Sequence, residues 1–303
     1  MFPGQGAQRV GMGRDLAERF PAARDTFAAI DDALGVALSR IMWDGPEDEL
    51  TRTHNTQPAI LAHSAAVWSV VRNKVGQVGA AAGHSLGDYS AHVAAGTLPP
   101  TAAAQLVRRR GELMFSAGET RPGAMAAVLG LATEQVDLAC NEASGQDGVA
   151  VAANLNAPDQ TVISGDPAAV ARAGESCKGR GAKRVIPLKV SGAFHSPLMA
   201  PAVDGLHDAL TDVRFADPAF PVIANASGEA VKTGTDAKRL LLDQLTAPVR
   251  WVACMQGAAT FVPGARFVEI GPGNVLSGLL KRIVPGAATV TLGTADEVEA
   301  FLA

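Results

Sequence analysis

Short runs of apolar residues alternate along this chain with longer segments in which apolar residues recur every three or four positions. The short runs predict buried strands, and the longer segments predict helices with one apolar face. Strands that alternate with helices are typical of an α/β fold with a largely parallel sheet. We therefore expect that fold class, and 303 residues are enough for a large domain that carries a smaller one.

The predicted elements of the first third of the chain surround one sharp turn. Residues 58–71 have a helical pattern, and the small apolar residues 78–82 predict a buried strand that enters the turn. A helix is expected over residues 85–95, where a glycine follows as a stop signal. Thr101 follows two prolines and is expected to cap the next helix, because its hydroxyl can accept a hydrogen bond from a free backbone N–H.

Residues 123–190 have another order of predicted elements, β-α-β-β-α-β, which is the ferredoxin-like arrangement. We expect these residues to form a small domain inserted into a core made of residues 1–122 and 191–303. The predicted strands of the insertion are 123–129, 149–155, 160–164 and 183–190, its helices are 133–143 and 167–178, and later helices at 196–210, 237–245 and 275–283 return to the core.

Composition excludes several classes of function. The chain is 48% hydrophobic and 18% charged, with a formal net charge of -4, which describes a globular protein with a substantial core. Lys and Arg are concentrated only at residues 108–110 and aromatic residues make up 5%, so a nucleic-acid interface is not expected. No apolar run is long enough to span a bilayer and no basic-then-apolar leader is present, so we expect a cytoplasmic protein without membrane contact.

The cysteines and histidines give no sign of a metal site. Cys140, Cys177 and Cys254 are scattered and lack zinc-site spacing, which is typical of reduced thiols. The histidines form no ligand-like group either. We expect neither a disulfide nor a bound metal ion.

The candidate nucleophile is Ser85, in the sequence Gly83-His84-Ser85-Leu86-Gly87. A G-x-S-x-G pentad lets a strand turn sharply into a helix, because its glycines remove the side chains that would clash there. The serine hydroxyl is then exposed at the corner of the turn. The pentad alone is only moderately specific, because so short a motif recurs by chance.

A serine nucleophile needs a base, and His195 is the best placed histidine. It precedes Ser196-Pro197, the pattern of an N-cap and first helical position. The positive end of that helix disfavours a charged imidazole and keeps the ring able to accept a proton. His84 is adjacent to Ser85, but a neighbour at a sharp turn points elsewhere. The alternative is that His195 only packs at the start of the helix.

Arg110 lies on the apolar stripe of its predicted helix, together with Leu106 and Val107, whereas Arg108 and Arg109 lie largely off it. A guanidinium that points inward needs an anionic partner, because an unpaired buried charge is costly. Two interpretations stay open. Arg110 pairs with a core Asp or Glu or extends to solvent at the helix edge, or it is a clamp for a substrate carboxylate.

Two glycine-rich segments are candidate turns. Residues 2–8 (Phe-Pro-Gly-Gln-Gly-Ala-Gln) would follow a first strand and could offer backbone N–H groups to an oxyanion, or simply connect a strand to a helix. Residues 269–273 (Glu-Ile-Gly-Pro-Gly) are most simply a turn between a strand and a helix. They are not a dinucleotide-binding fingerprint, because the third glycine is missing.

Taken together, these segments resemble the malonyl-CoA:acyl-carrier-protein transacylases of fatty-acid synthesis, and the acyltransferase domains of polyketide synthases more broadly. The resemblance implies an α/β-hydrolase-like parallel-sheet core with an inserted ferredoxin-like domain. It covers essentially the whole chain, because the matching motifs run in family order: Phe2-Pro3-Gly4-Gln5-Gly6, Thr56-Gln57-Pro58-Ala59, Gly83-His84-Ser85-Leu86-Gly87, Arg110-Gly111, Gly192-Ala193-Phe194-His195-Ser196-Pro197-Leu198-Met199 and Glu269-Ile270-Gly271-Pro272-Gly273.

The resemblance implies a catalytic role for five positions. Ser85 would be acylated by malonyl-CoA, and His195 would be its base, oriented by the main-chain carbonyl of Gln244. Gln244 lies in the last turn of its predicted helix, where carbonyl groups lack partners inside the helix. The backbone N–H groups of Gln5 and Leu86 would form the oxyanion hole.

The resemblance also implies the substrates. Arg110 would hold the malonyl carboxylate, with Gln57 lining the pocket, and Phe194 would leave little room for a methyl branch. The malonyl group would pass through a serine ester to the phosphopantetheine arm of acyl carrier protein, a transient partner. No cofactor would be bound, and we expect a monomer.

The sequence departs from the family pattern at two places. Only Met1 and Phe2 precede Pro3, where the family has a short apolar strand, and without such a strand we expect less support for the Gln5 loop. Asp88 stands where the bacterial enzymes often have glutamate, and we expect it on the exposed side of the helix after Ser85.

Other functions stay open at this point. Close variants are a stand-alone acyltransferase for a polyketide synthase and the transferase subunit of malonate decarboxylase. A serine esterase or thioesterase would need an Asp or Glu as third member of the triad and would give Arg110 no task. A non-catalytic module that docks carrier protein is disfavoured by the intact Ser85, His195 and Arg110.

Overall fold

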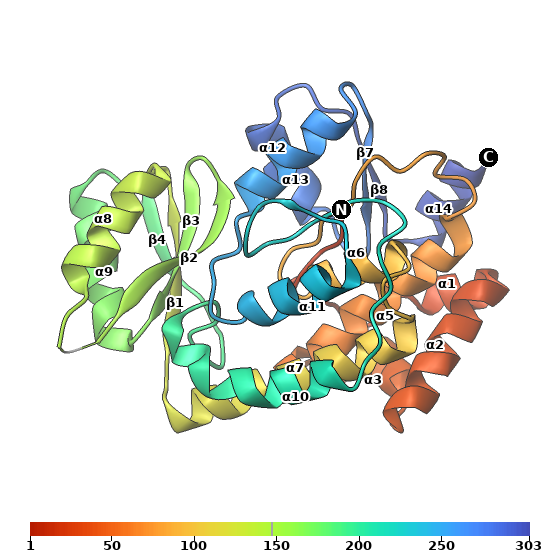
Figure 1. The fold of residues 1–303 in the computed structure, drawn as a ribbon, viewed down its shortest axis with the longest axis horizontal. Coiled ribbons are helices and arrows are strands. Elements are labelled where there is room, and N and C mark those ends of the chain that lie inside the picture. Colours follow the sequence, from red (N-terminus) through yellow and green to blue (C-terminus); the bar gives the residue numbers. More distant parts are fainter. Residues whose placement is uncertain (147) are drawn as a thin grey trace.

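The computed structural model describes residues 1–146 and 148–303 as an α/β fold, which confirms the expected class (Figure 1). A small sheet with α8 (Thr133–Ala143) and α9 (Pro167–Gly179) on its outer face lies at one end of the molecule. The larger part contains α1 (Arg14–Arg19), α2 (Pro21–Leu34), α3 (Leu38–Asp44), α4 (Glu47–Thr51), α5 (Thr53–Val71), α6 (Gly87–Ala94), α7 (Pro100–Thr120), η1 (Pro197–Ala202), α10 (Val203–Thr211), β5 (Val222–Ile223), β6 (Ala230–Val231), α11 (Gly234–Asp243), α12 (Trp251–Phe261), β7 (Phe267–Ile270), α13 (Val275–Ile283), β8 (Thr289–Leu292) and α14 (Ala295–Leu302).

The parallel sheet of the larger part is made of short pairings around the first two residues. Phe2 pairs in parallel with residues 82–84, with N···O distances of 3.0 and 2.9 Å. Met1 accepts a hydrogen bond from the N–H of Ile270 in β7, and β7 pairs in parallel with β8. Residue 81 pairs in parallel with β5. Met1 and Phe2 thus have neighbours on both sides, which anchors the glycine-rich loop that follows them.

The strand expected over residues 78–82 is shorter than predicted. Pairing begins at Ala81, whose N–H donates to the carbonyl of Pro221 at 2.8 Å. In the described part of the chain, the backbone of residues 78–80 forms no hydrogen bond with a neighbouring segment. The apolar run therefore predicted both burial and strand pairing only in part, because residues 81 and 82 are buried and residues 78–80 are half-buried.

Helix starts were also predicted wrongly at three places, one of them α11, which begins at Gly234 instead of residue 237. α5 begins at Thr53 with Pro58 inside it, because a proline near the start of a buried helix removes only one hydrogen bond. α7 begins at Pro100, and its N-cap is Pro99 instead of Thr101. The fixed φ of proline suits the first helical position, so the prolines belong to the helix start and Thr101 lies inside the helix.

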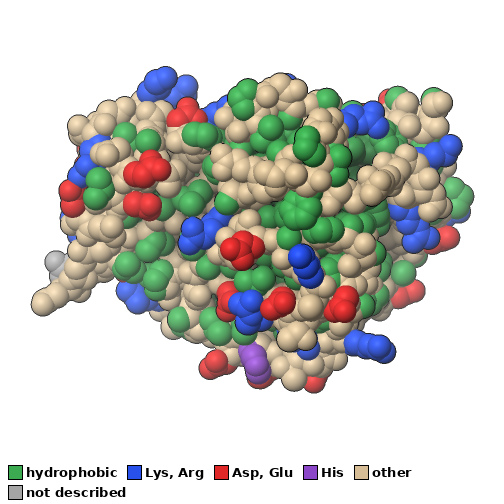
Figure 2. Space-filling model, turned by 45° about the horizontal axis from the view of Figure 1, so that its top comes forward, with side chains coloured by type: hydrophobic (Ala, Val, Ile, Leu, Met, Phe, Trp, Pro, Cys, Tyr) green, Lys and Arg blue, Asp and Glu red, His purple; other side chains and the backbone are tan. Residues whose placement is uncertain are grey.

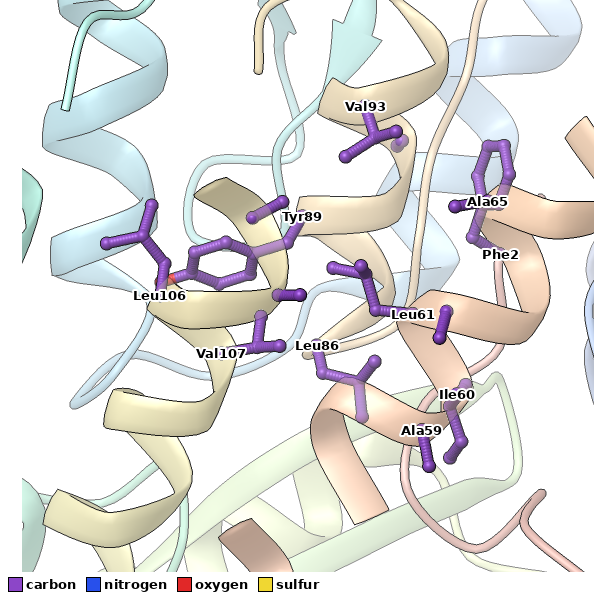
Figure 3. Close-up of a cluster of buried hydrophobic side chains, with 14 of the residues drawn as sticks. Phe2, Ala59, Ile60, Leu61, Ala65, Leu86, Tyr89, Val93, Leu106 and Val107 are labelled. Atoms are coloured by element: carbon purple, nitrogen blue, oxygen red, sulfur yellow. The ribbon is translucent and has the colours of Figure 1, made fainter. Parts of the chain in front are cut away.

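The helices α5, α6 and α7 share one buried apolar cluster with the parallel segments (Figure 3). Leu61 of α5, Tyr89 of α6 and Val107 of α7 are among its fully buried members. α6 begins two residues after Ser85 and α7 carries Arg110, so this packing fixes the nucleophile turn relative to that arginine.

The small sheet is antiparallel, in the order β2-β3-β1-β4. Along its strand β1, Ala126 and Val128 pack beneath α8 and α9, whereas Met125 and Ala127 line a cavity that also contains Ser85. The sheet therefore covers the candidate site with the face opposite its helices. Its strands are β1 (Ala124–Leu129), β2 (Ala150–Ala157), β3 (Gln160–Gly165) and β4 (Arg184–Pro187).

The two segments that connect the small sheet to the rest of the chain cross at a glycine. A Cβ on Gly118, near the end of α7, would overlap the carbonyl oxygen of Ser191. Only glycine permits so close an approach of two backbones. The crossing brings the segment before His195 directly against α7.

The charges are mixed on the face shown in Figure 2, where lysine and arginine side chains stand among acidic ones instead of forming one basic field. Most arginine ion pairs are at the surface, such as Arg121 with Asp166 and Arg109 with Glu112. Among the described residues, no helix combines the length and the hydropathy that crossing a membrane would require.

The buried His92 of α6 predicts how stability depends on pH. Burial lowers the pKa of His92 from 6.5 to about 3. The unfolded chain therefore binds a proton that the folded chain excludes, and below pH 6.5 this group lowers the free energy of unfolding by about 1.4 kcal/mol per pH unit. The free energy of unfolding of His92→Gln, measured with urea between about pH 6 and pH 5, should therefore change less steeply with pH than that of the native chain, by the same amount per pH unit. Above about pH 7.5 the free energies of the two proteins should depend on pH equally. An equal dependence at acid pH would contradict a buried neutral ring.

Candidate active site

Ser85 lies at a sharp turn between residue 83, which pairs with Phe2, and the start of α6. Its φ is 53°, in the left-handed region that is strained for a residue with a side chain. A Cβ on Gly83 would overlap the carbonyl of Gly87, so the turn closes only with glycine at that position. Ser85 lines a cavity of about 300 Å³.

His195 contacts Ser85 and the main chain of Gln244. Its Nε2 lies 2.8 Å from Ser85 Oγ, and its Nδ1 lies 2.9 Å from the Gln244 carbonyl oxygen. A carbonyl only accepts hydrogen bonds, so Nδ1 carries the proton and Nε2 is left to accept from the serine hydroxyl. Burial, and after it the nearby Arg110 guanidinium, lower the pKa of His195 to about 3. The ring is therefore neutral and can accept a proton from Ser85.

Gln244 is the residue at the C-terminal end of α11, where main-chain carbonyls have no partner within the helix. Its carbonyl takes the position that an acidic residue has in a serine-histidine-aspartate triad. In the part of the chain that the structure describes, no Asp or Glu side chain contacts the ring of His195. The expected geometry of a hydrolase triad is absent there.

Arg110 is 1% exposed and points towards Ser85 from α7. Nη1 donates to Gln57 Oε1 at 2.7 Å, and Nη2 donates to Gln244 Oε1 at 3.0 Å and to Ser85 Oγ at 3.2 Å. The guanidinium carbon also lies 5.9 Å from the ring centre of Tyr89. Among the described residues no carboxylate forms an ion pair with it, so the interpretation as a core ion pair is wrong.

The cavity at Ser85 lies between the small sheet and the core. Phe194, which is 6% exposed, lines it beside Ser85 and His195, the candidate catalytic dyad. From the small sheet, the polar residues Asn154, Asn156 and Gln160 line it. We did not predict these three residues, because they line the cavity only through the packing of the small sheet against the larger part. No sequence pattern at residues 149–155 marks them, because Asn154 is the one polar residue of that apolar run.

The loop at Gln5 and the start of α6 both border this cavity. Within the described residues, neither the main-chain N–H of Gln5 nor that of Leu86 donates a hydrogen bond. Free N–H groups beside a nucleophile are what an oxyanion hole requires. Gly4 packs against the backbone of His84, and this contact brings the Gln5 loop to the serine turn.

His84 itself faces away from the serine hydroxyl. Its Nε2 lies 2.8 Å from Asn156 Oδ1, and its ring lies 5.5 Å from that of Trp251. In the described part of the chain, no group of three or more His, Cys, Asp and Glu side chains has the arrangement of a metal site.

The expectation for Asp88 was wrong. Asp88 is buried, 1% exposed, because α6 turns this side of its first turn towards β5 and α11. Burial raises the pKa of its carboxyl to about 7, against hydrogen bonds from Asn225 and Gln244 that lower it. Asn225 was missed altogether, although its side chain accepts from the N–H of Ser85 at 2.7 Å. It follows a strand 140 residues further along the chain, and no local motif marks it.

Comparison with known proteins gives a consistent result. The profile of the family "Acyl transferase domain" matches residues 1–294. The malonyl CoA-acyl carrier protein transacylase of Bacillus subtilis is 41% identical in an alignment of 304 positions that covers 99% of this chain and 94% of that protein. The protein of the same name from Escherichia coli K12 is 41% identical over 305 residues, 100% of this chain and 97% of that one.

Solved structures agree. An acyl carrier protein S-malonyltransferase from Vibrio cholerae has a TM-score of 0.93 and 43% identity, over 99% of this chain and 97% of that one. A malonyl-transacylase in complex with its type II PKS acyl-carrier protein, PlMCAT:AntF, has a TM-score of 0.93 and 42% identity, over 99% of this chain and 97% of that one.

Proposed function

This chain belongs to the acyl transferase domain family, and we infer that it transfers the malonyl group of malonyl-CoA to the phosphopantetheine thiol of acyl carrier protein for fatty-acid synthesis. Relatives of that name match it over nearly its whole length. The observation that carries the inference is that Arg110, a positive charge, is buried beside Ser85 and has no carboxylate partner among the described residues. A hydrolase of neutral esters has no use for such a charge.

In the first half of the reaction, the Ser85 hydroxyl attacks the thioester carbonyl of malonyl-CoA. His195 Nε2 takes the hydroxyl proton, as its distance of 2.8 Å from Ser85 Oγ allows. The tetrahedral intermediate collapses, the carbon–sulfur bond breaks, and CoA leaves with the proton from His195. The product is a malonyl ester on Ser85.

In the second half, the phosphopantetheine thiol of acyl carrier protein gives its proton to His195 and attacks the ester carbonyl. The carbon–oxygen bond to Ser85 breaks, and the serine oxygen recovers the proton from His195. Each half forms an imidazolium for a moment. The Gln244 carbonyl, 2.9 Å from Nδ1, stabilises that charge without an acidic residue.

The oxyanion of each tetrahedral intermediate binds to the main-chain N–H groups of Gln5 and Leu86. Both groups border the cavity and have no other partner in the described part of the chain. Donors that are already in position need no rearrangement as charge develops on the oxygen.

Arg110 binds the malonyl carboxylate, and Gln57 orients the guanidinium through its contact with Nη1. A charge-assisted hydrogen bond of this kind contributes roughly 1.5–3 kcal/mol, which favours malonyl over acetyl groups. Phe194 lies beside the dyad and leaves little space for a methyl branch, so plain malonyl is the preferred substrate.

The architecture that goes with this function is an α/β-hydrolase-like core of residues 1–122 and 191–303 and a ferredoxin-like insertion of residues 123–190. The strand order β2-β3-β1-β4 and the position of α8 and α9 on one face support the second part of this proposal. The amides of the small sheet line the cavity, where they suit the polar phosphopantetheine arm. The protein acts as a monomer and needs no bound cofactor.

Supply of a polyketide synthase is a second candidate, because a malonyl-transacylase solved with its type II PKS acyl-carrier protein is 42% identical to this chain. The chemistry at Ser85 is the same in both. Transfer rates to a fatty-acid carrier protein and to a polyketide carrier protein would separate the two roles.

The proposed function predicts a covalent malonyl ester. Intact-protein mass spectrometry of the native chain with malonyl-CoA should show one malonyl adduct, which holo acyl carrier protein removes. Ser85→Ala should show none, because it lacks the attacking oxygen. Release of free malonate without transfer to the carrier protein would indicate a hydrolase instead.

The charge of Arg110 predicts a loss of selectivity when it is removed. In Arg110→Gln, kcat/KM for loading Ser85 from malonyl-CoA should fall roughly 10- to 100-fold more than from acetyl-CoA, because only malonyl has a carboxylate. Arg109→Ala, on the exposed side of α7, is the control and should keep the native ratio. An equal loss for both substrates in Arg110→Gln would contradict the role of a carboxylate clamp.

A further inference from the structure

Asp88 lies in the first turn of α6, three residues after the nucleophile, and is buried. Its Oδ2 accepts a hydrogen bond from Nε2 of Gln244 at 2.9 Å and one from the main-chain N–H of Asn225 at 3.1 Å. The proposed reaction gives this carboxyl no task. A buried carboxyl is costly unless its contacts offset that cost, so the two residues it contacts indicate what it does.

These two residues hold the strained turn at Ser85 from both sides. The N–H of Ser85 donates to Asn225 Oδ1 at 2.7 Å, and the carbonyl of Ser85 accepts from Gln244 Nε2 at 3.1 Å. A left-handed backbone at a residue with a side chain costs of order 1–3 kcal/mol and persists only where its surroundings hold it. Asp88 contacts both supports of the turn.

Gln244 also connects Asp88 to Arg110. Its Nε2 donates to Asp88, while its Oε1 accepts from Arg110 Nη2 at 3.0 Å. A side-chain amide can be turned by half a rotation, which exchanges its oxygen and its nitrogen. Asp88 Oδ2, at 2.9 Å, is the nearer of two acceptors, with the carbonyl of Ser85 at 3.1 Å, that select the orientation presenting the oxygen to the guanidinium. The other orientation would set donor against donor at Arg110.

We propose that Asp88 is a positioning residue for malonyl selection: by accepting from Gln244 it fixes the amide orientation that holds Arg110 beside Ser85. The guanidinium is then held by neutral amides, with no carboxylate of the protein in contact with it. A substrate carboxylate can therefore take that position. The inference rests on the malonyl transfer proposed above and adds to it a residue that controls its selectivity.

The role does not depend on the charge of Asp88. Burial raises the pKa of its carboxyl to about 7, and the hydrogen bonds from Asn225 and Gln244, together with the Arg110 charge, lower it. In either protonation state the carboxyl keeps an acceptor oxygen for Gln244. A test of this role must therefore remove the oxygen of Asp88 that accepts the hydrogen bond from Gln244.

Two variants separate the acceptor from the shape of the side chain. Asp88→Asn keeps an acceptor oxygen, and Asp88→Leu keeps the branching of the side chain with a larger volume and no acceptor. The measurement is kcat and KM for loading of Ser85 from malonyl-CoA and from acetyl-CoA. In Asp88→Leu the malonyl-over-acetyl ratio of kcat/KM should fall at least about fivefold, mainly through KM for malonyl-CoA, and in Asp88→Asn it should stay within about twofold of native.

A native ratio in Asp88→Leu would overturn the proposal, as would an equal loss for both substrates in both variants, which a merely structural role predicts. If Asp88→Leu does not fold, Gln244→Met decides, because it removes the same amide and keeps the main-chain carbonyl that faces His195. It should lower the ratio to a similar extent, and an unchanged ratio would refute the proposal. A native chain that malonyl-CoA does not load would instead refute the proposed function.

Discussion

A buried guanidinium must be surrounded by groups that accept its hydrogen bonds, and much of the candidate site is arranged around this requirement for Arg110. The oxygens of Gln57 and Gln244 and the hydroxyl of Ser85 accept from its two terminal nitrogens, and the ring of Tyr89 lies near the guanidinium, whereas Nε has no partner among the described residues. No described carboxylate contacts the group. The positive charge therefore stays uncompensated by direct contact. Under the proposed function, an acidic acyl group that arrives at Ser85 would complete the arrangement and would give the site both its affinity and its selectivity.

One residue couples this charge to the catalytic groups. Gln244 contacts His195 through its main-chain carbonyl, Arg110 through Oε1, and the carbonyl of Ser85 through Nε2. The candidate base, the buried charge of Arg110 and the strained turn at Ser85 thus share one support at the end of α11. The buried carboxyl of Asp88 in turn contacts this support. A small shift of α11 would therefore change proton transfer and substrate binding together.

The parts of the site that could be predicted are those with a local signal. The pentad marks Ser85, the helix-start pattern marks His195, and the position of Arg110 on an apolar stripe marks its burial. Asn225 and Asp88 could not be assigned a role, because their contacts join segments that are far apart in the chain. The same limit applies to the fold: residues 123–190 have regular local patterns, whereas the parallel pairings of the larger part are too short for their pattern to set their ends.

The central claim is that Arg110 binds the carboxylate of the acyl group while Ser85 carries it. The most direct test is a crystal structure of the chain trapped as the malonyl ester on Ser85. The account predicts a carboxylate oxygen within hydrogen-bonding distance of the Arg110 guanidinium, with Gln57 and Gln244 still in contact with it. A malonyl carboxylate that points to solvent, with Arg110 unchanged from its position here, would contradict the account.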